Sequence, residues 1–126
     1  MVNRQKKTSF FGAFKYAWSG IVATFKSERN FKVELGCAAF ALVAAGMFAL
    51  EPLEWAIIIL LIVLVLVLEL LNSALESLTD LASPAKHPLA KYVKDAMAGA
   101  VLLASIGSVV IGLIIFIHAG LRLWGA

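Results

Sequence analysis

Charged residues and cysteines are both scarce in this 126-residue chain, and each shortage excludes a class of protein. Charged residues make up 15% of the chain and hydrophobic residues 62%, with a mean hydropathy of +0.94. A soluble domain has about 25% charged and about 45–50% apolar residues, so this composition excludes an ordinary soluble fold. The single cysteine, Cys37, cannot form a disulfide within the chain, and a metal–thiolate site is not expected.

The familiar nucleotide-binding motifs are missing as well. The chain has neither a Walker A motif nor a GxGxxG motif, and it lacks the HRD and DFG motifs of protein kinases. A bound nucleotide would therefore be held by carboxylates through a metal ion, and by lysines, on a helical scaffold. We expect no nucleic-acid partner.

Three long apolar segments are present instead, and they predict an all-α integral membrane protein with three transmembrane helices. They cover about residues 33–50, 53–81 and 88–118 of a single domain over residues 1–126. The first is near the lower limit of the roughly 20 residues that cross a bilayer. A short turn that contains Pro52 separates the first two segments, and a polar loop follows the second.

A further helix is predicted before the first span, over about residues 8–29. Its apolar residues recur at spacings of three and four, with basic and polar residues between them. These apolar residues are Phe11, Phe14, Trp18, Ile21 and Phe25. The pattern is typical of an amphipathic surface helix, which lies in the membrane interface with its aromatic side chains in the lipid.

The basic residues are distributed unevenly around the spans. Only Arg122 follows the third span, and none lies between the first and the second. Those before the first span are Arg4, Lys6, Lys7, Lys15, Lys26, Arg29 and Lys32, and those after the second are Lys86, Lys91 and Lys94. The positive-inside rule then predicts a cytoplasmic N-terminus and second loop, and a C-terminus outside.

A row of polar residues continues the second apolar segment. It consists of Glu69, Asn72, Ser73, Glu76 and Asp80. At 100° per residue these side chains fall within roughly 100° of one another around a helix. Carboxylates at membrane depth are costly and usually mark proton, ion or substrate chemistry. Because Glu69 is the deepest and Asp80 the nearest to the cytoplasm, we expect a polar cleft that opens to the cytoplasm.

More charged residues flank this row on the other segments. Lys91, Lys94 and Asp95 lie in the first two turns of the third span. Two lysines alone would be explained by binding to lipid phosphates. Opposite a row of carboxylates, they indicate a site that binds both metal and phosphate.

Glu28 and Glu34 lie at the start of the first span and are candidate ligands together with Glu76. Oxygen ligands without a histidine or cysteine cluster favour Mg²⁺, which typically binds one or two carboxylates and substrate phosphates. His87, in the second loop, is a candidate contact for a nucleotide.

Small residues recur every four positions along the third span, which lets membrane helices approach closely. They are Ala96, Ala100, Ala104, Ser108 and Gly112. Three short helices also enclose little interior. The pattern therefore favours a homo-oligomer with a site between subunits.

Two segments resemble the signatures of the prokaryotic diacylglycerol kinase and undecaprenol kinase family. ELLNSALESLTD (69–80) resembles E-x-x-N-[ST]-A-[IL]-E-x-x-x-D, and AKYVKDAMAGAVLL (90–103) resembles A-K-x-x-K-D-x-x-A-G-A-V-L. SFFGAFKYAWSGI and SERNFKVEL resemble the N-terminal elements of the family, so the likeness covers nearly the whole chain. The chain departs from a common version of the signature in having Ser73 for threonine and Thr79 before Asp80; both changes are mild and leave every charged position intact.

The resemblance implies a homotrimeric lipid kinase of the bacterial inner membrane, with composite active sites on the cytoplasmic side. It would use ATP and Mg²⁺ to phosphorylate a lipid alcohol. Glu69 would be the general base and Asn72 would support it. The other implied roles are Mg²⁺ and ATP binding by Glu28 and Glu76, ATP contact by Tyr16, His87, Lys94 and Asp95, substrate contact by Glu34, and support by Asp80 and Lys91.

Three functions stay open at this point. The form KHPLAKYVKD looks more like the Gram-positive branch of the family, which favours undecaprenol as the substrate; diacylglycerol, giving phosphatidic acid, is the alternative. A small proton-coupled transporter subunit would explain Glu69. It would leave Glu28, Glu76 and Lys94 without a shared role.

Overall fold

The computed structural model describes residues 9–125, and all regular structure in this part of the chain is helical. It consists of α1 (Phe10–Ser27), α2 (Arg29–Met47), α3 (Pro52–Ala82) and α4 (Pro88–Trp124). α2, α3 and α4 are each long and apolar enough to cross a membrane. The predicted all-α fold with three membrane-spanning helices is therefore confirmed.

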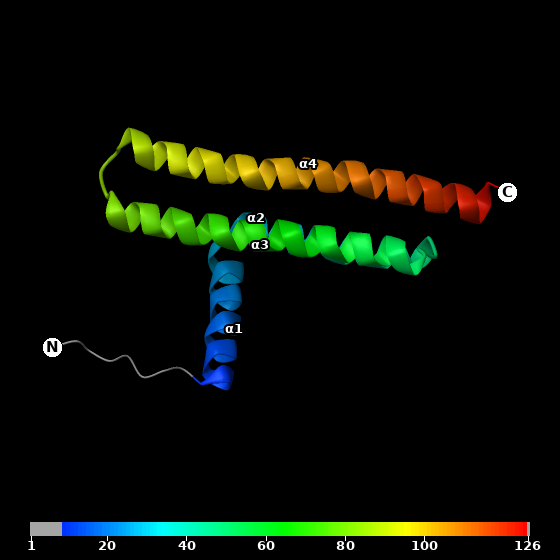
Figure 1. Ribbon diagram of the computed structural model, residues 1–126, viewed down its shortest axis with the longest axis horizontal. Helices are drawn as coiled ribbons and strands as arrows, with labels where there is room; N and C mark the ends of the chain where they lie inside the picture. The colour runs from blue at the N-terminus through cyan, green and yellow to red at the C-terminus, as the bar shows by residue number, and fades with distance from the viewer. Residues whose placement is uncertain (1–8, 126) are drawn as a thin grey trace.

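α3 is the central helix of the bundle. It packs against α4 and α2 and also touches α1. Figure 1 shows α3 and α4 side by side and antiparallel, with α2 behind α3. α1 projects away from the three long helices instead of lying along them (Figure 1), as expected of a helix that rests in the membrane interface.

α1 exposes the face that the sequence predicts to be apolar. The exposed residues of that face are Phe11, Phe14, Trp18, Ile21 and Phe25. Ser9 caps the helix by accepting a hydrogen bond from the backbone N–H of Gly12 at 3.1 Å. The predicted start at residue 8 lies outside the described part of the chain.

Glu28 alone separates α1 from α2. Its backbone is extended, with φ −110° and ψ 115°, so the helix axis changes direction there without a loop. The first span consequently begins at Arg29 and not at residue 33 as predicted. The charged side chains of Arg29 and Lys32 are exposed in the first turn of α2, where they do not interrupt the helix.

α2 ends at Met47, before the predicted limit at residue 50. The chain reverses through Ala49, whose φ of 52° is the one left-handed conformation of a non-glycine residue among residues 9–125. Pro52 then begins α3 at the first helical position, where its missing N–H removes no helical hydrogen bond.

α4 continues to Trp124, past the predicted end at residue 118, because no proline or capping residue interrupts the helix there. Gly120, within this extension, allows a close approach: a Cβ at this position would lie 3.4 Å from the ring of Phe48. At its other end α4 is capped by His87, whose Nδ1 accepts a hydrogen bond from the backbone N–H of Leu89 at 3.1 Å.

The buried apolar core is small and lies in the half of the bundle near the α2–α3 turn. Its members are Ala45, Leu50, Ile58, Ile115 and Ala119. At most 11% of the residues in the apolar window of each long helix are buried within the chain. One copy of the chain therefore leaves most of its apolar surface for lipid or for other subunits.

Candidate active site

Glu69 is the one buried charged residue in the described part of the chain, with 1% of its surface exposed. Its Oε2 has no hydrogen-bond partner. Burying a carboxylate without partners is costly, and most buried polar atoms in proteins are paired. An ionisable group kept in this state within a membrane-spanning helix is a strong candidate for a catalytic role.

Other polar side chains gather around Glu69. Glu28 and Glu76 both lie near enough to interact with it electrostatically, and Asn72 contacts its carboxyl group from the next turn of α3. Glu34 on α2 also interacts electrostatically with Glu69, and its Oε2 is likewise buried without a partner. The structure thus brings four carboxylates and one amide into a single cluster.

The fold positions these groups in two ways. Glu69, Asn72 and Glu76 follow one another at spacings of three and four, so α3 presents them on one face. Glu28 reaches the cluster because the chain bends at this residue between α1 and α2. Phe31, in the first turn of α2, is 2% exposed and anchors this junction.

Lys94 lies at the edge of the cluster. Its Nζ is 2.6 Å from Oδ1 of Asp80, and it also interacts electrostatically with Glu76. Both side chains of the Lys94–Asp80 pair are well exposed. Lys94 therefore extends the cluster toward the α3–α4 loop, and Asp80 is its partner in a single chain.

The remaining predicted site residues lie on the surface of the chain. Lys91 and Asp95 form an exposed ion pair one turn apart on α4. Tyr16 is 71% exposed on α1. His87 uses its Nδ1 to cap α4, and its side chain is exposed. One copy of the chain does not bring these four residues onto Glu69.

The arrangement of the carboxylates limits how a metal ion could bind. Among residues 9–125, no group of three His, Cys, Asp or Glu side chains is placed to hold an ion by itself. Mg²⁺ usually binds through one or two carboxylates and completes its shell with water and substrate phosphates. Glu28 and Glu76 fit an ion that arrives with phosphates and do not fit a permanently bound one.

A cleft with several hydroxyl groups in its lining lies between α1 and α3, beside Glu28. Its volume is about 380 Å³, and Thr24, Ser27, Ser73 and Ser77 contribute hydroxyl groups to its lining. The hydroxyl of Ser73 is buried without a hydrogen-bond partner. The sequence places Ser73 in the polar row but assigns it no contact; its position between α1 and α3 depends on the bend at Glu28.

A second cavity, the α2–α4 groove, lies on the other side of the cluster. It has walls from α2 and α4, a floor from α3, and a volume of about 360 Å³. Its lining runs from Glu34 to Phe116 and is almost entirely apolar. Sequence reasoning missed this groove because residues from three helices form it and none of them is unusual alone.

Comparison with known proteins identifies the relatives of the chain. The profile of the prokaryotic diacylglycerol kinase family matches residues 15–116. The undecaprenol kinase of Bacillus subtilis is 43% identical over 115 residues, which cover 91% of this chain and 94% of that protein. A diacylglycerol kinase of Synechocystis is 44% identical over 101 residues, covering 79% of this chain and 58% of that protein.

The diacylglycerol kinase of Escherichia coli is more distant, at 31% identity over 103 residues, or 82% of this chain and 84% of that protein. The region matched by the family profile includes Glu28, Glu69 and Glu76. The resemblance found in the two sequence signatures is therefore confirmed. The chain belongs to the prokaryotic diacylglycerol kinase family, a family of membrane lipid kinases that use ATP as the phosphate donor.

Proposed function

We propose that this enzyme transfers the terminal phosphate of MgATP to the hydroxyl group of undecaprenol at the cytoplasmic face of the membrane. The observation that carries the proposal is the buried, unpaired carboxyl group of Glu69 with Glu28 and Glu76 beside it. The choice of lipid is supported by the Bacillus subtilis relative, which the alignment covers over 94% of its length.

Glu69 acts as the general base. Its carboxylate takes the proton of the lipid hydroxyl as that oxygen attacks the terminal phosphorus. A new O–P bond forms, the bond to the bridging oxygen breaks, and ADP leaves with the electron pair. Asn72, which contacts the same carboxyl group, holds it in orientation. Burial of Glu69 keeps bulk water away from the reacting phosphate, which favours transfer to the alcohol over hydrolysis.

Glu28 and Glu76 hold the Mg²⁺ that accompanies the ATP phosphates. Phosphoryl transfer depends mainly on positioning and on neutralising the charge of the phosphate oxygens, which is the chemistry that Mg²⁺ supplies when bound. Lys94 adds a positive charge at the edge of the cluster and contacts the phosphates. The other assigned contacts are Tyr16, His87 and Asp95 to the nucleotide and Glu34 to the lipid, with Asp80 and Lys91 in support.

The active enzyme is a homotrimer with sites shared between subunits. Two observations support this assembly. The long helices leave large apolar residues exposed along their length, and α4 carries small residues at Ala96, Ala100 and Ala104, outside the α2–α4 groove. Tyr16, His87 and Asp95 are exposed in one chain, so a neighbouring subunit can bring such residues to the cluster of another.

The phosphorylated lipid forms on the cytoplasmic side of the bacterial inner membrane. Lys86, Lys91 and Lys94 lie around the α3–α4 loop, at the end of the bundle where the carboxylate row emerges. Positively charged loops remain in the cytoplasm. This is also the side on which ATP is available.

A diacylglycerol kinase is the second candidate, because relatives with that name from Synechocystis and Escherichia coli also align with most of this chain. The deciding experiment uses purified protein in mixed micelles with labelled ATP and Mg²⁺, and offers undecaprenol and diacylglycerol side by side. Preferential labelling of the polyprenol supports the proposal. Preference for diacylglycerol selects the second candidate, and labelling of neither lipid contradicts both.

A further inference from the structure

The α2–α4 groove is the feature that the proposed chemistry does not use. Its apolar lining includes Cys37, Ile62 and Gly112, one from each of the helices that form it. Within the bilayer an apolar groove gains little from excluding water, because lipid tails are as apolar as its walls. Its value lies in shape: it can hold one apolar group in a fixed position.

The groove begins at the active site. Glu34 lines it, and the carboxyl group of Glu34 interacts electrostatically with Glu69. From there it follows α4 from Ser105 to Phe116, which at 1.5 Å per residue is roughly 16 Å. An alcohol whose hydroxyl group reaches Glu69 can therefore lay its hydrocarbon chain directly into the groove.

The size of the groove decides what can occupy it. The volume sets the length of chain that fits. A cavity of about 150 Å³ holds benzene, so about 360 Å³ holds roughly 15 carbon atoms. That equals about three isoprene units, or most of one fatty acyl chain. It does not hold two chains side by side.

We propose that the α2–α4 groove binds a single hydrocarbon chain of the lipid alcohol, over the roughly 15 carbons nearest the hydroxyl group. It thereby favours alcohols with one chain over those with two. This inference rests on the proposed function and identifies the part of the substrate that determines the selectivity of the enzyme.

The first test is a series of prenols from 5 to about 55 carbons, each compared at the same mole fraction in micelles. The value of kcat/KM should rise about tenfold up to roughly 15 carbons and then stay constant, because longer chains extend beyond the groove. A value that is independent of length, or that keeps rising, would overturn the groove assignment while leaving the kinase intact. Labelling of no alcohol at all would instead overturn the proposed function.

A matched pair of variants separates the groove from the rest of α4. Gly112 lines the groove, and a Cβ there meets no atom within 4 Å, so the side chain of Gly112→Leu starts in open space and should occupy part of the groove. Gly107 has equally open space but does not line the groove, which makes Gly107→Leu the control. Only Gly112→Leu should lower kcat/KM for long prenols, by about tenfold, and move the plateau to shorter chains. Equal effects of both variants would contradict the proposal.

Photolabelling tests occupancy without relying on turnover. A prenol with a diazirine near its tenth carbon should label Cys37, Ala41 or Gly112, which line the groove. Labelling of the outward face of α3 instead, at Leu60 or Val63, would show that the chain lies elsewhere. An unlabelled groove with cross-links between two copies would assign it to a subunit contact and overturn the inference.

Discussion

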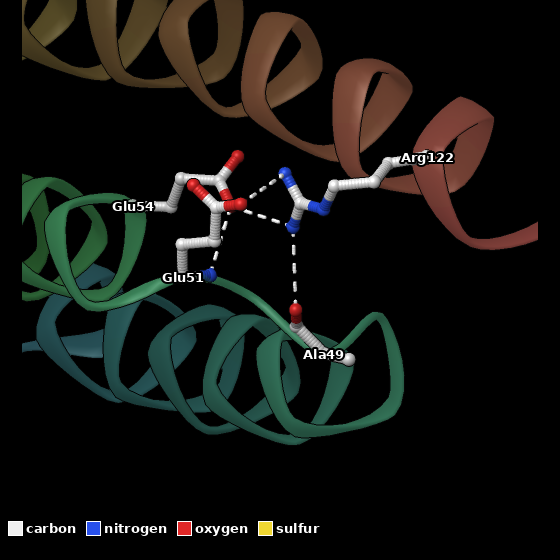
Figure 2. A network of polar contacts seen from close by, with 4 residues as sticks. All are labelled: Ala49, Glu51, Glu54 and Arg122. Carbon is white, nitrogen blue, oxygen red and sulfur yellow. Dashed lines mark hydrogen bonds and ion pairs between the residues drawn. The ribbon is translucent and has the colours of Figure 1, made fainter.

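At the end of the bundle where α4 finishes, the charged side chains are paired, whereas around Glu69 they are not. Nη2 of Arg122 donates to the carbonyl oxygen of Ala49 at 3.2 Å and to Oε1 of Glu54 at 2.8 Å. The backbone N–H of Glu51 donates to the same Oε1 at 2.8 Å (Figure 2). We call this region the Arg122 end; it ties α4 to the turn between α2 and α3.

The apolar groups of the Arg122 end are equally well packed. The ring of Phe48 meets those of Phe116 and Trp124 edge to face, at centroid distances of 5.3 and 5.1 Å. Ala45 and Ala119 are completely buried, which brings the helices close together. Around Glu69, by contrast, two carboxyl oxygens lack partners and a cavity opens on each side.

The difference separates the Arg122 end, which stabilises the fold, from the surroundings of Glu69, where polar side chains remain unpaired. Paired charges and dense packing at the Arg122 end stabilise the fold without touching a substrate. Unpaired carboxylates near Glu69 destabilise it and leave carboxyl oxygens without partners in the chain. Proteins that violate the usual rules of polar pairing do so mainly at functional sites.

The largest expected effect is on turnover at the Glu69 site. Glu69→Gln should lower kcat by about 10²–10⁴-fold, because the amide cannot accept the proton of the lipid hydroxyl. The midpoint of thermal unfolding should not fall, since the substitution removes a buried charge that Glu28 and Glu76 repel. Both are measured on purified protein by phosphate transfer and by heating in detergent.

Glu51→Gln is the matched control, because Glu51 is an exposed carboxylate at the Arg122 end. It should retain full turnover. Normal turnover of Glu69→Gln would remove Glu69 from its role as the base.

The next effect tests the packing of the Arg122 end. Ala119→Leu adds three carbons at a site with no exposed surface and should destabilise the protein by about 1–3 kcal/mol. Ala39→Leu, at an exposed position on α2, should be close to neutral. Equal unfolding midpoints for the two variants would show that the Arg122 end is not tightly packed in the membrane.

Removal of the Arg122 side chain should have a smaller effect. Arg122→Ala leaves Glu54, whose side chain is 13% exposed, without its ion-pair partner. The midpoint of thermal unfolding should fall by several degrees, while kcat below that temperature stays unchanged because Glu69 is remote. Arg122→Lys should recover only part of the loss, since lysine cannot reproduce the forked contacts of a guanidinium. A fall in kcat with an unchanged midpoint of thermal unfolding would contradict the conclusion that the Arg122 end stabilises the fold and does not contribute to turnover.

The smallest effect concerns the ion pair at the edge of the site. Asp80→Asn releases Lys94 from an exposed partner at 2.6 Å. Because Asp80 supports Lys94 in the site, KM for ATP should increase by a few-fold, with little change in stability. Steady-state kinetics at varied ATP check this, and a decrease in KM would show that Asp80 instead competes with phosphate for Lys94.

Much of the fold follows from local sequence properties. Hydropathy and length suffice for the three spans, and the spacing of Phe11, Phe14 and Trp18 predicts a separate amphipathic helix. The helix ends are less accurate, because the extended backbone of Glu28 has no marker such as glycine or proline. The end of α4 is placed too early, at residue 118, although no proline or capping residue interrupts the helix before Trp124.

The composition of the site and the order of its residues along α3 are predictable, but the burial of Glu69 is not. Helical spacing places Glu69, Asn72 and Glu76 on one face of α3, as the structure has them. It also makes Glu69 deeper than Asp80, but it cannot tell that Glu69 is buried within a single chain, since that depends on how α2 packs. The pairing of Arg122 with Glu54, 68 positions apart, also escapes any local pattern.

The bend at Glu28 has a mechanical consequence. A flexible loop between α1 and α2 would let the surface helix move without disturbing the carboxylates. Because one extended residue forms the whole connection, α1 cannot move independently of the Glu28 carboxylate. The orientation of α1 and the position of the Glu28 carboxylate are therefore coupled, so whatever moves that helix also moves a carboxylate of the cluster around Glu69.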